Sequence, residues 1–106
     1  ARLFIRSALD GRWKDAKRLV VQDSLNIQDI ETAQRMADRW DVNTQRGYRE
    51  AQIRIHDTRK QGDSVSIITY SNTFKNQRDS IKVISIGGQW LVDLKYSFHR
   101  NNAAQQ

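Results

Sequence analysis

The segment IGGQWLVDLKYSF, residues 86–98, decides the fold of this chain. From Trp90 to Phe98, large apolar side chains alternate with polar ones, and an alternation of period two is typical of a strand with one buried face. The two glycines before it, Gly87 and Gly88, suit the central positions of a two-residue hairpin turn, since both positions need a positive φ. The segment therefore predicts a β-hairpin whose second strand closes the core.

A two-residue turn also fixes which residues face each other in the two strands. Opposite charges that face each other attract, so we expect an ion pair between Lys82 and Asp93. We also expect Trp90 to be a core residue, because it lies on the face that carries Val92. The predicted facing pairs are Ile86–Gln89, Ser85–Trp90, Ile84–Leu91, Val83–Val92, Lys82–Asp93 and Ile81–Leu94.

Upstream of this hairpin, the period of the apolar pattern changes once along the chain. Up to Glu50 the apolar residues recur with the period of a helix. After Glu50 they recur at every second residue, as in a strand, with turns around Gly62 and Asn76. We expect an α+β fold in which three N-terminal helices pack on a curved four-stranded antiparallel sheet. Residues 1–100 would form a single domain, followed by a disordered tail, 101–106. Helices are expected over residues 3–8, 13–20 and 29–40, an irregular segment over 41–49, and strands around residues 53–56, 65–70, 81–86 and 89–98.

Composition and charge narrow the functional classes. The chain has 106 residues, a net charge of +6 and no cysteine, so it has no disulfide and no thiol chemistry. Residues 1–20 hold six cations and two carboxylates, hence +4, which we interpret as the solvated faces of amphipathic helices. No nucleic-acid motif is recognised, and no apolar run reaches the ~20 residues that cross a bilayer. Because the sequence starts at Ala1 without methionine, we expect a processed or truncated start.

Three segments together resemble a known family. They are ALDGRWKDA (residues 8–16), SVSIITYSN (64–72) and GQWLVDL (88–94). Their order is similar to that in small bacterial domains of unknown function with a nuclear-transport-factor-2-like, or cystatin-like, fold, which are common in Bacteroidetes and often are lipoproteins. The resemblance implies a cone-shaped sheet with a cavity, a location in the cell envelope and a lipid anchor upstream of Ala1. It implies no catalytic residue.

The acid–base groups of the chain do not predict a catalytic pair. His56 and Asp57 are adjacent on a predicted strand and should point to opposite faces, whereas Asp93 and His99 lie ~20 Å apart along a strand. Two separated histidines without cysteine predict no metal site, and no cofactor is expected. Ser64, Ser66 and Ser71 have no nearby base in the sequence, and we expect them at strand edges or facing outward.

Aromatic residues are the remaining functional feature. They could line a cavity mouth, where their polar tips would meet a ligand, or they could simply be core residues. We expect a non-catalytic envelope domain that binds a small apolar ligand or a protein partner through its cavity or sheet face. Alternatives are a small isomerase or dehydratase on the same fold and a homodimerising domain without ligand. The candidate ligand-binding residues are Trp13, Tyr48, Tyr70, Trp90 and Tyr96.

Overall fold

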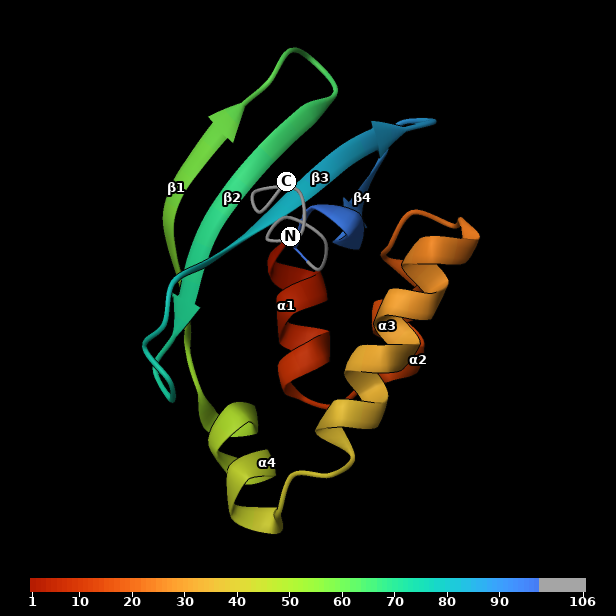
Figure 1. Ribbon diagram of the computed structural model, residues 1–106. Coiled ribbons are helices and arrows are strands. Elements are labelled where there is room, and N and C mark those ends of the chain that lie inside the picture. Colours follow the sequence, from red (N-terminus) through yellow and green to blue (C-terminus); the bar gives the residue numbers. More distant parts are fainter. Residues whose placement is uncertain (98–106) are drawn as a thin grey trace, which may run out of the picture.

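The computed structural model describes residues 1–97 and has an α+β architecture. Four helices precede the sheet, so the expectation of three was wrong, and residues 94–97 form a further helical turn after it. The helices α1, α2 and α3 lie on the concave side of the curved sheet, and α4 lies at one end (Figure 1). The elements are α1 Arg2–Leu9, α2 Trp13–Arg18, α3 Ser24–Ala37, α4 Val42–Glu50, β1 Ile53–Lys60, β2 Val65–Asn72, β3 Asp79–Ile86 and β4 Gln89–Asp93.

The sheet is an antiparallel meander in the order β1-β2-β3-β4, as the sequence predicts. Gly87 and Gly88 connect β3 to β4 with φ angles of 59° and 81°, the positive values that a type I′ turn requires. The resulting register matches the prediction from Ile86–Gln89 down to Lys82–Asp93. The turn therefore sets the register of the last hairpin.

The last strand is shorter than its alternating pattern suggests. It ends at Asp93, and Leu94 begins a helical turn instead of pairing with Ile81. The backbone N–H of Leu94 donates to the side chain of Asn26 at 2.7 Å, and that of Lys95 donates to Asp93 Oδ1 at 3.2 Å. Side chains thus hold the backbone N–H groups of Leu94 and Lys95 where the strand ends. The expectation that the strand continues beyond Asp93 was therefore wrong, and only its expected last residue, Phe98, lies outside the described residues.

The outer edge of β4 is covered by the segment that follows α2. Val20 forms an isolated parallel bridge with Val92. Two backbone hydrogen bonds hold it: Val92 N donates to Leu19 O at 2.8 Å, and Val21 N donates to Val92 O at 2.9 Å. Covering an edge in this way satisfies backbone groups that would otherwise be unpaired. The sequence pattern did not predict this contact.

Two helix boundaries differ from the expectation because their signals are polar. The third helix begins at Ser24, not at Asp29, since the Asp23 side chain caps it by accepting from the Asn26 N–H at 2.8 Å. The segment expected to be irregular forms α4, which the side chain of Asp41 caps by accepting from the Thr44 N–H at 2.7 Å. No residue of α4 is buried, so it lacks the apolar stripe that periodicity detects.

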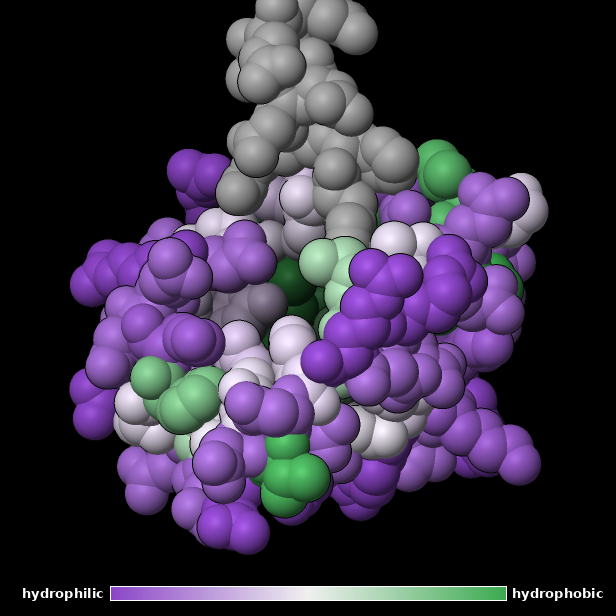
Figure 2. Space-filling model, turned by 60° about the horizontal axis from the view of Figure 1, so that its bottom comes forward, coloured by the Kyte–Doolittle hydropathy of each residue, from purple (hydrophilic) through white to green (hydrophobic). Residues whose placement is uncertain are grey.

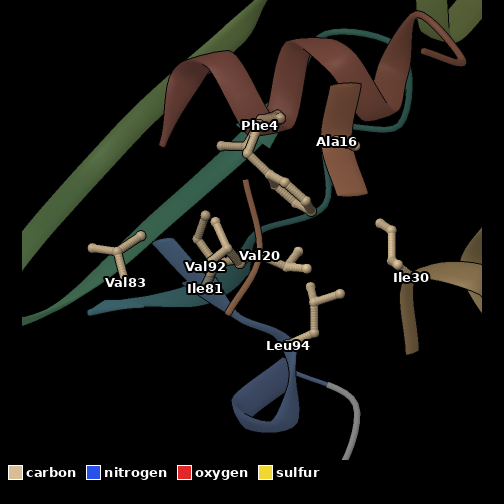
Figure 3. Packing of buried hydrophobic residues seen from close by; sticks show 9 residues of the cluster. Phe4, Ala16, Val20, Ile30, Ile81, Val83, Val92 and Leu94 are labelled. Atoms are coloured by element: carbon tan, nitrogen blue, oxygen red, sulfur yellow. The ribbon is translucent and has the colours of Figure 1, made fainter. Parts of the chain in front are cut away.

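The core lies between the helices and the concave face of the sheet (Figure 3). Trp90 is not part of it: this residue is 47% exposed, so the expectation of a core tryptophan was wrong. It sits next to the turn, opposite the small Ser85, and the core begins one same-face pair further along, at Val83 and Val92. The buried core cluster comprises Phe4, Ile5, Ala16, Val20, Ile30, Ile81, Val83, Val92 and Leu94.

Candidate functional site

An apolar pocket of about 220 Å³ lies between the helices and the sheet. Figure 2, which brings the lower side of Figure 1 forward, shows a hollow with hydrophobic residues at its floor and hydrophilic residues around it. Helices α1 and α3, the start of α2, the strands β2 and β3 and the turn after β4 all contribute to the wall. We call this hollow the apolar pocket; it is lined by Phe4, Ala8, Trp13, Ile30, Ala33, Tyr70, Asp79, Ile81, Leu94 and Ser97.

The apolar pocket is graded from an apolar floor to a polar mouth. Ile30 and Ile81 are each 2% exposed and belong to the core cluster. Tyr70 is half-buried, and its cross-strand partner Asp79, at the start of β3, is exposed. Ser97 is also half-buried, and its hydroxyl donates to the Ser80 carbonyl at 2.8 Å. A bound molecule would therefore have its apolar part inside and its polar part near Tyr70 and Asp79.

The phenol of Tyr70 is kept neutral by its surroundings. Burial raises the pKa of Tyr70 well above its ordinary value, and the negative charge of Asp79 raises that pKa further. Within residues 1–97 its hydroxyl makes no hydrogen bond to another side chain or to the backbone. A neutral phenol both donates and accepts hydrogen bonds, so Tyr70 has this capacity available for a ligand.

A second, more polar hollow of about 260 Å³ adjoins the first and shares Ala8 and Trp13 with it. One of its carboxylates, Asp10, forms an ion pair with Arg6 at 2.9 Å and another with Arg12 at 3.4 Å. Its walls come from the ends of α1 and α3 and from α4. The residues that line it are Ala8, Leu9, Asp10, Gly11, Trp13, Ala37, Asp38, Trp40, Gln45 and Arg49.

Arg6 positions α4, and with it one wall of the second hollow. Its guanidinium donates to the carbonyls of Ala51 at 2.6 Å, Arg49 at 3.0 Å and Tyr48 at 3.1 Å. These are carbonyls at the C-terminal end of α4, where a helix leaves its acceptors unsatisfied and where positive charge is favourable. Arg6 therefore ties the end of α4, which has no buried residue, to α1.

The predicted aromatic residues do not converge on one site. Trp13 lines both hollows, and Tyr70 lines the apolar pocket. Tyr48 lines neither, because its ring stacks on Trp40 with centroids 4.4 Å apart and meets the edge of Phe74 at 4.9 Å. Trp90 is at the tip of the last hairpin, and the half-buried Tyr96 is in the turn after β4; neither lines these hollows.

His56 has a partner that the sequence did not predict. A β-bulge between Ile55 and Asp57 leaves His56 without a cross-strand partner, so the regular pairing of β1 with β2 is interrupted there. Its Nε2 lies 2.7 Å from the hydroxyl of Ser71, which is 5% exposed. The expectation that Ser71 faces outward without a nearby base was therefore wrong. This pair does not line the apolar pocket, and His99 lies outside the described residues.

Asp93 does not form the predicted ion pair, although Lys82 is its cross-strand partner as expected. Its carboxylate turns to α3 and accepts from Asn26 Nδ2 at 3.2 Å. The same amide group donates to Asp23 Oδ1 at 3.1 Å, and Asp23 Oδ2 accepts from Lys95 Nζ at 3.0 Å. Asp93 is thus part of a polar network that joins α3 to β4 and is buried at Asn26 and Asp93.

Several lining residues were missed by the search for aromatic side chains. Helical spacing marks Phe4 and Ala33 as inward-facing, but it does not separate a pocket wall from ordinary core. Asp79 faces Tyr70 only because of the length of the β2–β3 connection, residues 73–78, which the sequence alone does not fix.

Comparison with known proteins adds no family to these observations. No protein-family model, curated protein or solved structure matches the chain. Within residues 1–97 there is no group of three or more histidine or acidic side chains placed to hold a metal ion. In the same part of the chain, none of the helices combines the length and the apolar character that crossing a membrane requires.

Proposed function

We propose that this protein is a binding domain that takes a small, mainly apolar molecule into the apolar pocket. The observation that carries the proposal is a pocket of about 220 Å³ with an apolar floor and a few polar groups at one end. This combination is what small-molecule sites commonly have, because apolar walls supply affinity and a few polar groups fix orientation. Tyr70 supplies such a group.

We infer that the chain is of the nuclear-transport-factor-2-like type that its sequence resembles. Two observations support this: a curved antiparallel sheet with helices on its concave face, and a pocket between the two layers. The envelope location and the lipid anchor that accompany this resemblance stay predictions. The candidate base His56 and the carboxylate Asp93 do not line the apolar pocket, so the geometry favours binding over an isomerase or dehydratase reaction.

A titration with 2-phenylethanol, a neutral molecule with an apolar ring and one hydroxyl, tests the proposal. The indole N–H signals in a proton–nitrogen NMR spectrum report separately on each tryptophan. We expect the signal of Trp13, in the pocket wall, to shift with saturation, and the signal of Trp90, at the hairpin tip, to stay in place. A shift of Trp90 alone, or no shift at saturating concentration, would refute the proposal.

Matched variants on α3 localise the binding. Ala33→Leu adds bulk inside the apolar pocket and should weaken the binding of 2-phenylethanol at least about tenfold. The reason is that the probe and the larger side chain compete for the same volume. Met36→Leu, at a position on the same helix that is 58% exposed, should leave binding unchanged. If the NMR spectrum of Ala33→Leu loses its dispersion, that variant does not fold. Ala8→Val then takes its place, because it narrows the same pocket from α1. Equal affinity in a folded pocket variant and in the control contradicts the assignment.

A further inference from the structure

We propose that the second, more polar hollow, which we call the polar hollow, binds a saccharide: a neutral six-membered ring that carries several hydroxyl groups. This inference goes beyond the proposed function, because it concerns a different hollow and a different chemical class of ligand. Three features of the lining support it, namely two tryptophan side chains, polar side chains with hydrogen-bonding groups to spare, and a balance of charge.

Two indole rings supply the apolar surface that a sugar ring needs. Trp13, at the start of α2, and Trp40, between α3 and α4, both line the polar hollow. The C–H groups on the face of a sugar ring pack on an aromatic ring, while the hydroxyl groups extend from the edge. Trp40 is 37% exposed, and its ring is held by stacking on Tyr48 with centroids 4.4 Å apart. Because a ring that is already held loses little freedom on binding, this stack favours a ligand.

Polar side chains near the rings have unused hydrogen-bonding capacity. The Gln45 amide donates to the Trp40 carbonyl at 3.1 Å, and within residues 1–97 its oxygen accepts from no donor. In that part of the chain the Asp38 carboxylate and the Arg49 guanidinium form no hydrogen bond or ion pair. A hydroxyl group both donates and accepts, so it can donate to Asp38 or Gln45 and accept from Arg49. These groups together match a molecule with several hydroxyls.

The charges that line the polar hollow are balanced. Asp10 is compensated by two cations, because it pairs with Arg6 at 2.9 Å and with Arg12 at 3.4 Å. The other charged lining residues are Asp38 and Arg49, one of each sign. A cationic ligand would be repelled by Arg49, and an anionic ligand would be repelled by Asp38. The lining therefore favours a neutral ligand.

The volume suits one sugar ring. A protein cavity of about 150 Å³ accommodates benzene, so a hollow of about 260 Å³ accommodates a pyranose of about twelve non-hydrogen atoms. A ligand of this size makes few contacts, and we expect a dissociation constant on the order of 1 mM for a single ring. NMR titration measures affinities in this range.

The methyl pyranosides of glucose, galactose and mannose are the probes, and the indole N–H signals are the readout. We expect at least one of the three to shift the Trp40 signal with saturation and to leave the Trp90 signal in place, because Trp90 does not line the hollow. Cyclohexylmethanol has a similar ring but a single hydroxyl. It should bind at Trp40 at least about tenfold more weakly, since it leaves the polar groups of the site unmatched.

Charged derivatives of the sugar that binds best test the neutral class. Its 2-amino derivative is a cation at pH 6, and its 6-carboxylate derivative is an anion. We expect both to bind no more than about threefold more tightly than the neutral sugar, because the lining holds one charge of each sign. Binding of either derivative at least about tenfold more tightly would show that the hollow selects a charge, and would overturn the inference.

Matched variants on α4 locate the site. Arg49→Ala removes a donor from the polar hollow and should weaken the sugar at least about threefold. Arg46→Ala removes an equally charged and exposed side chain that does not line the hollow, and it should leave binding unchanged. Trp40→Ala should weaken the sugar at least about tenfold, read from the backbone signal of Gln45. If Trp40→Ala does not fold, the Arg49 and Arg46 variants still decide.

The outcomes separate this inference from the proposed function. Trp13 lines both hollows, but Trp40 lines the polar hollow and not the apolar pocket, so the two sites are read from different signals. If no sugar shifts Trp40 while 2-phenylethanol shifts Trp13, the saccharide inference is overturned and the proposed function stands. Equal binding of sugar to Arg49→Ala and Arg46→Ala also overturns it. A shift of Trp40 that weakens with Arg49→Ala and persists with Arg46→Ala supports it.

Discussion

The side-chain oxygen of Asn26 accepts a hydrogen bond of 2.7 Å from the backbone N–H of Leu94, and this bond joins the first turns of α3 to the end of β4. Asn26 is 0% exposed, so neither group of its amide can turn to water. Its NH₂ group donates to Asp23 and Asp93. The bond also fixes the backbone of Leu94, whose side chain lines the apolar pocket.

Asn26→Ala should therefore be among the more destabilising single changes in the chain. It leaves the Leu94 N–H and the Asp93 carboxylate without their buried partner, and we expect a loss of about 3–5 kcal/mol in the free energy of unfolding. Urea titration followed by circular dichroism measures this loss. The exposed control on the same helix, Gln28→Ala, should change stability by less than about 0.5 kcal/mol. A loss below about 1 kcal/mol for Asn26→Ala would mean that water replaces the network.

The exchange of Lys82 and Asp93 should not be tolerated. If these residues formed a simple cross-strand ion pair, Lys82→Asp with Asp93→Lys would restore the attraction. In the structure Asp93 is 8% exposed and its carboxylate is bonded to Asn26, so a lysine there loses that bond and is itself buried. We expect the double variant to be at least about 2 kcal/mol less stable than the unchanged protein. Near-equal stability in a denaturant titration would show that the cross-strand pair is dominant after all.

Trp90→Ala should cost less than about 1 kcal/mol, because the side chain is 47% exposed at the hairpin tip. Val92→Ala, one same-face position further along, removes a side chain that is 2% exposed in the core and should cost about 2 kcal/mol or more. Thermal unfolding of the two variants side by side gives the comparison. The reverse order of stabilities would place Trp90 in the core and contradict the fold described above.

The last hairpin shows which features of the fold can be predicted from a short stretch of sequence. The turn at Gly87 and Gly88 sets the register over five facing pairs, so that part of the fold follows from the sequence alone. Burial does not follow in the same way, because alternation identifies a face of the strand but not how far the helices cover it. Trp90 shares its face with Val92 and lies beyond the core.

Polar contacts between distant residues explain the elements and the site residues that the sequence did not predict. Helix α4 depends on Arg6, more than 40 residues away, and β4 stops where Asn26 takes the N–H of Leu94. Neither contact leaves a periodic trace in the sequence. Trp13 and Tyr70 were found as pocket residues because they are aromatic, but Asp79 becomes part of the site only through the pairing of β2 with β3.

Acid should weaken the network at Asp23. The hydrogen bond from the Asn26 N–H, and next the one from the Lys95 ammonium, lower the pKa of Asp23 below its ordinary value. Because the folded pKa is lower than the unfolded one, this stabilisation is fully present above the unfolded pKa of about 4 and is lost as the pH falls through the folded value. We expect Asp23→Ser, a neutral helix cap, to lose less stability than the unchanged protein between pH 5 and pH 2. Denaturant titrations give the free energy of unfolding of both proteins at each pH. If the two free energies fall in parallel as the pH is lowered, Asp23 does not have this role.

The central claim is that the apolar pocket, and not the exposed hairpin tip, receives the ligand. Its most direct test is the set of intermolecular nuclear Overhauser effects between the ring protons of 2-phenylethanol and methyl-labelled protein. We predict contacts to the methyl groups of Ile30, Ile81 and Leu94, which line the pocket, and none to Ile86, which is 48% exposed beside the turn. Contacts to Ile86 without contacts to Ile30 and Ile81 would contradict the account.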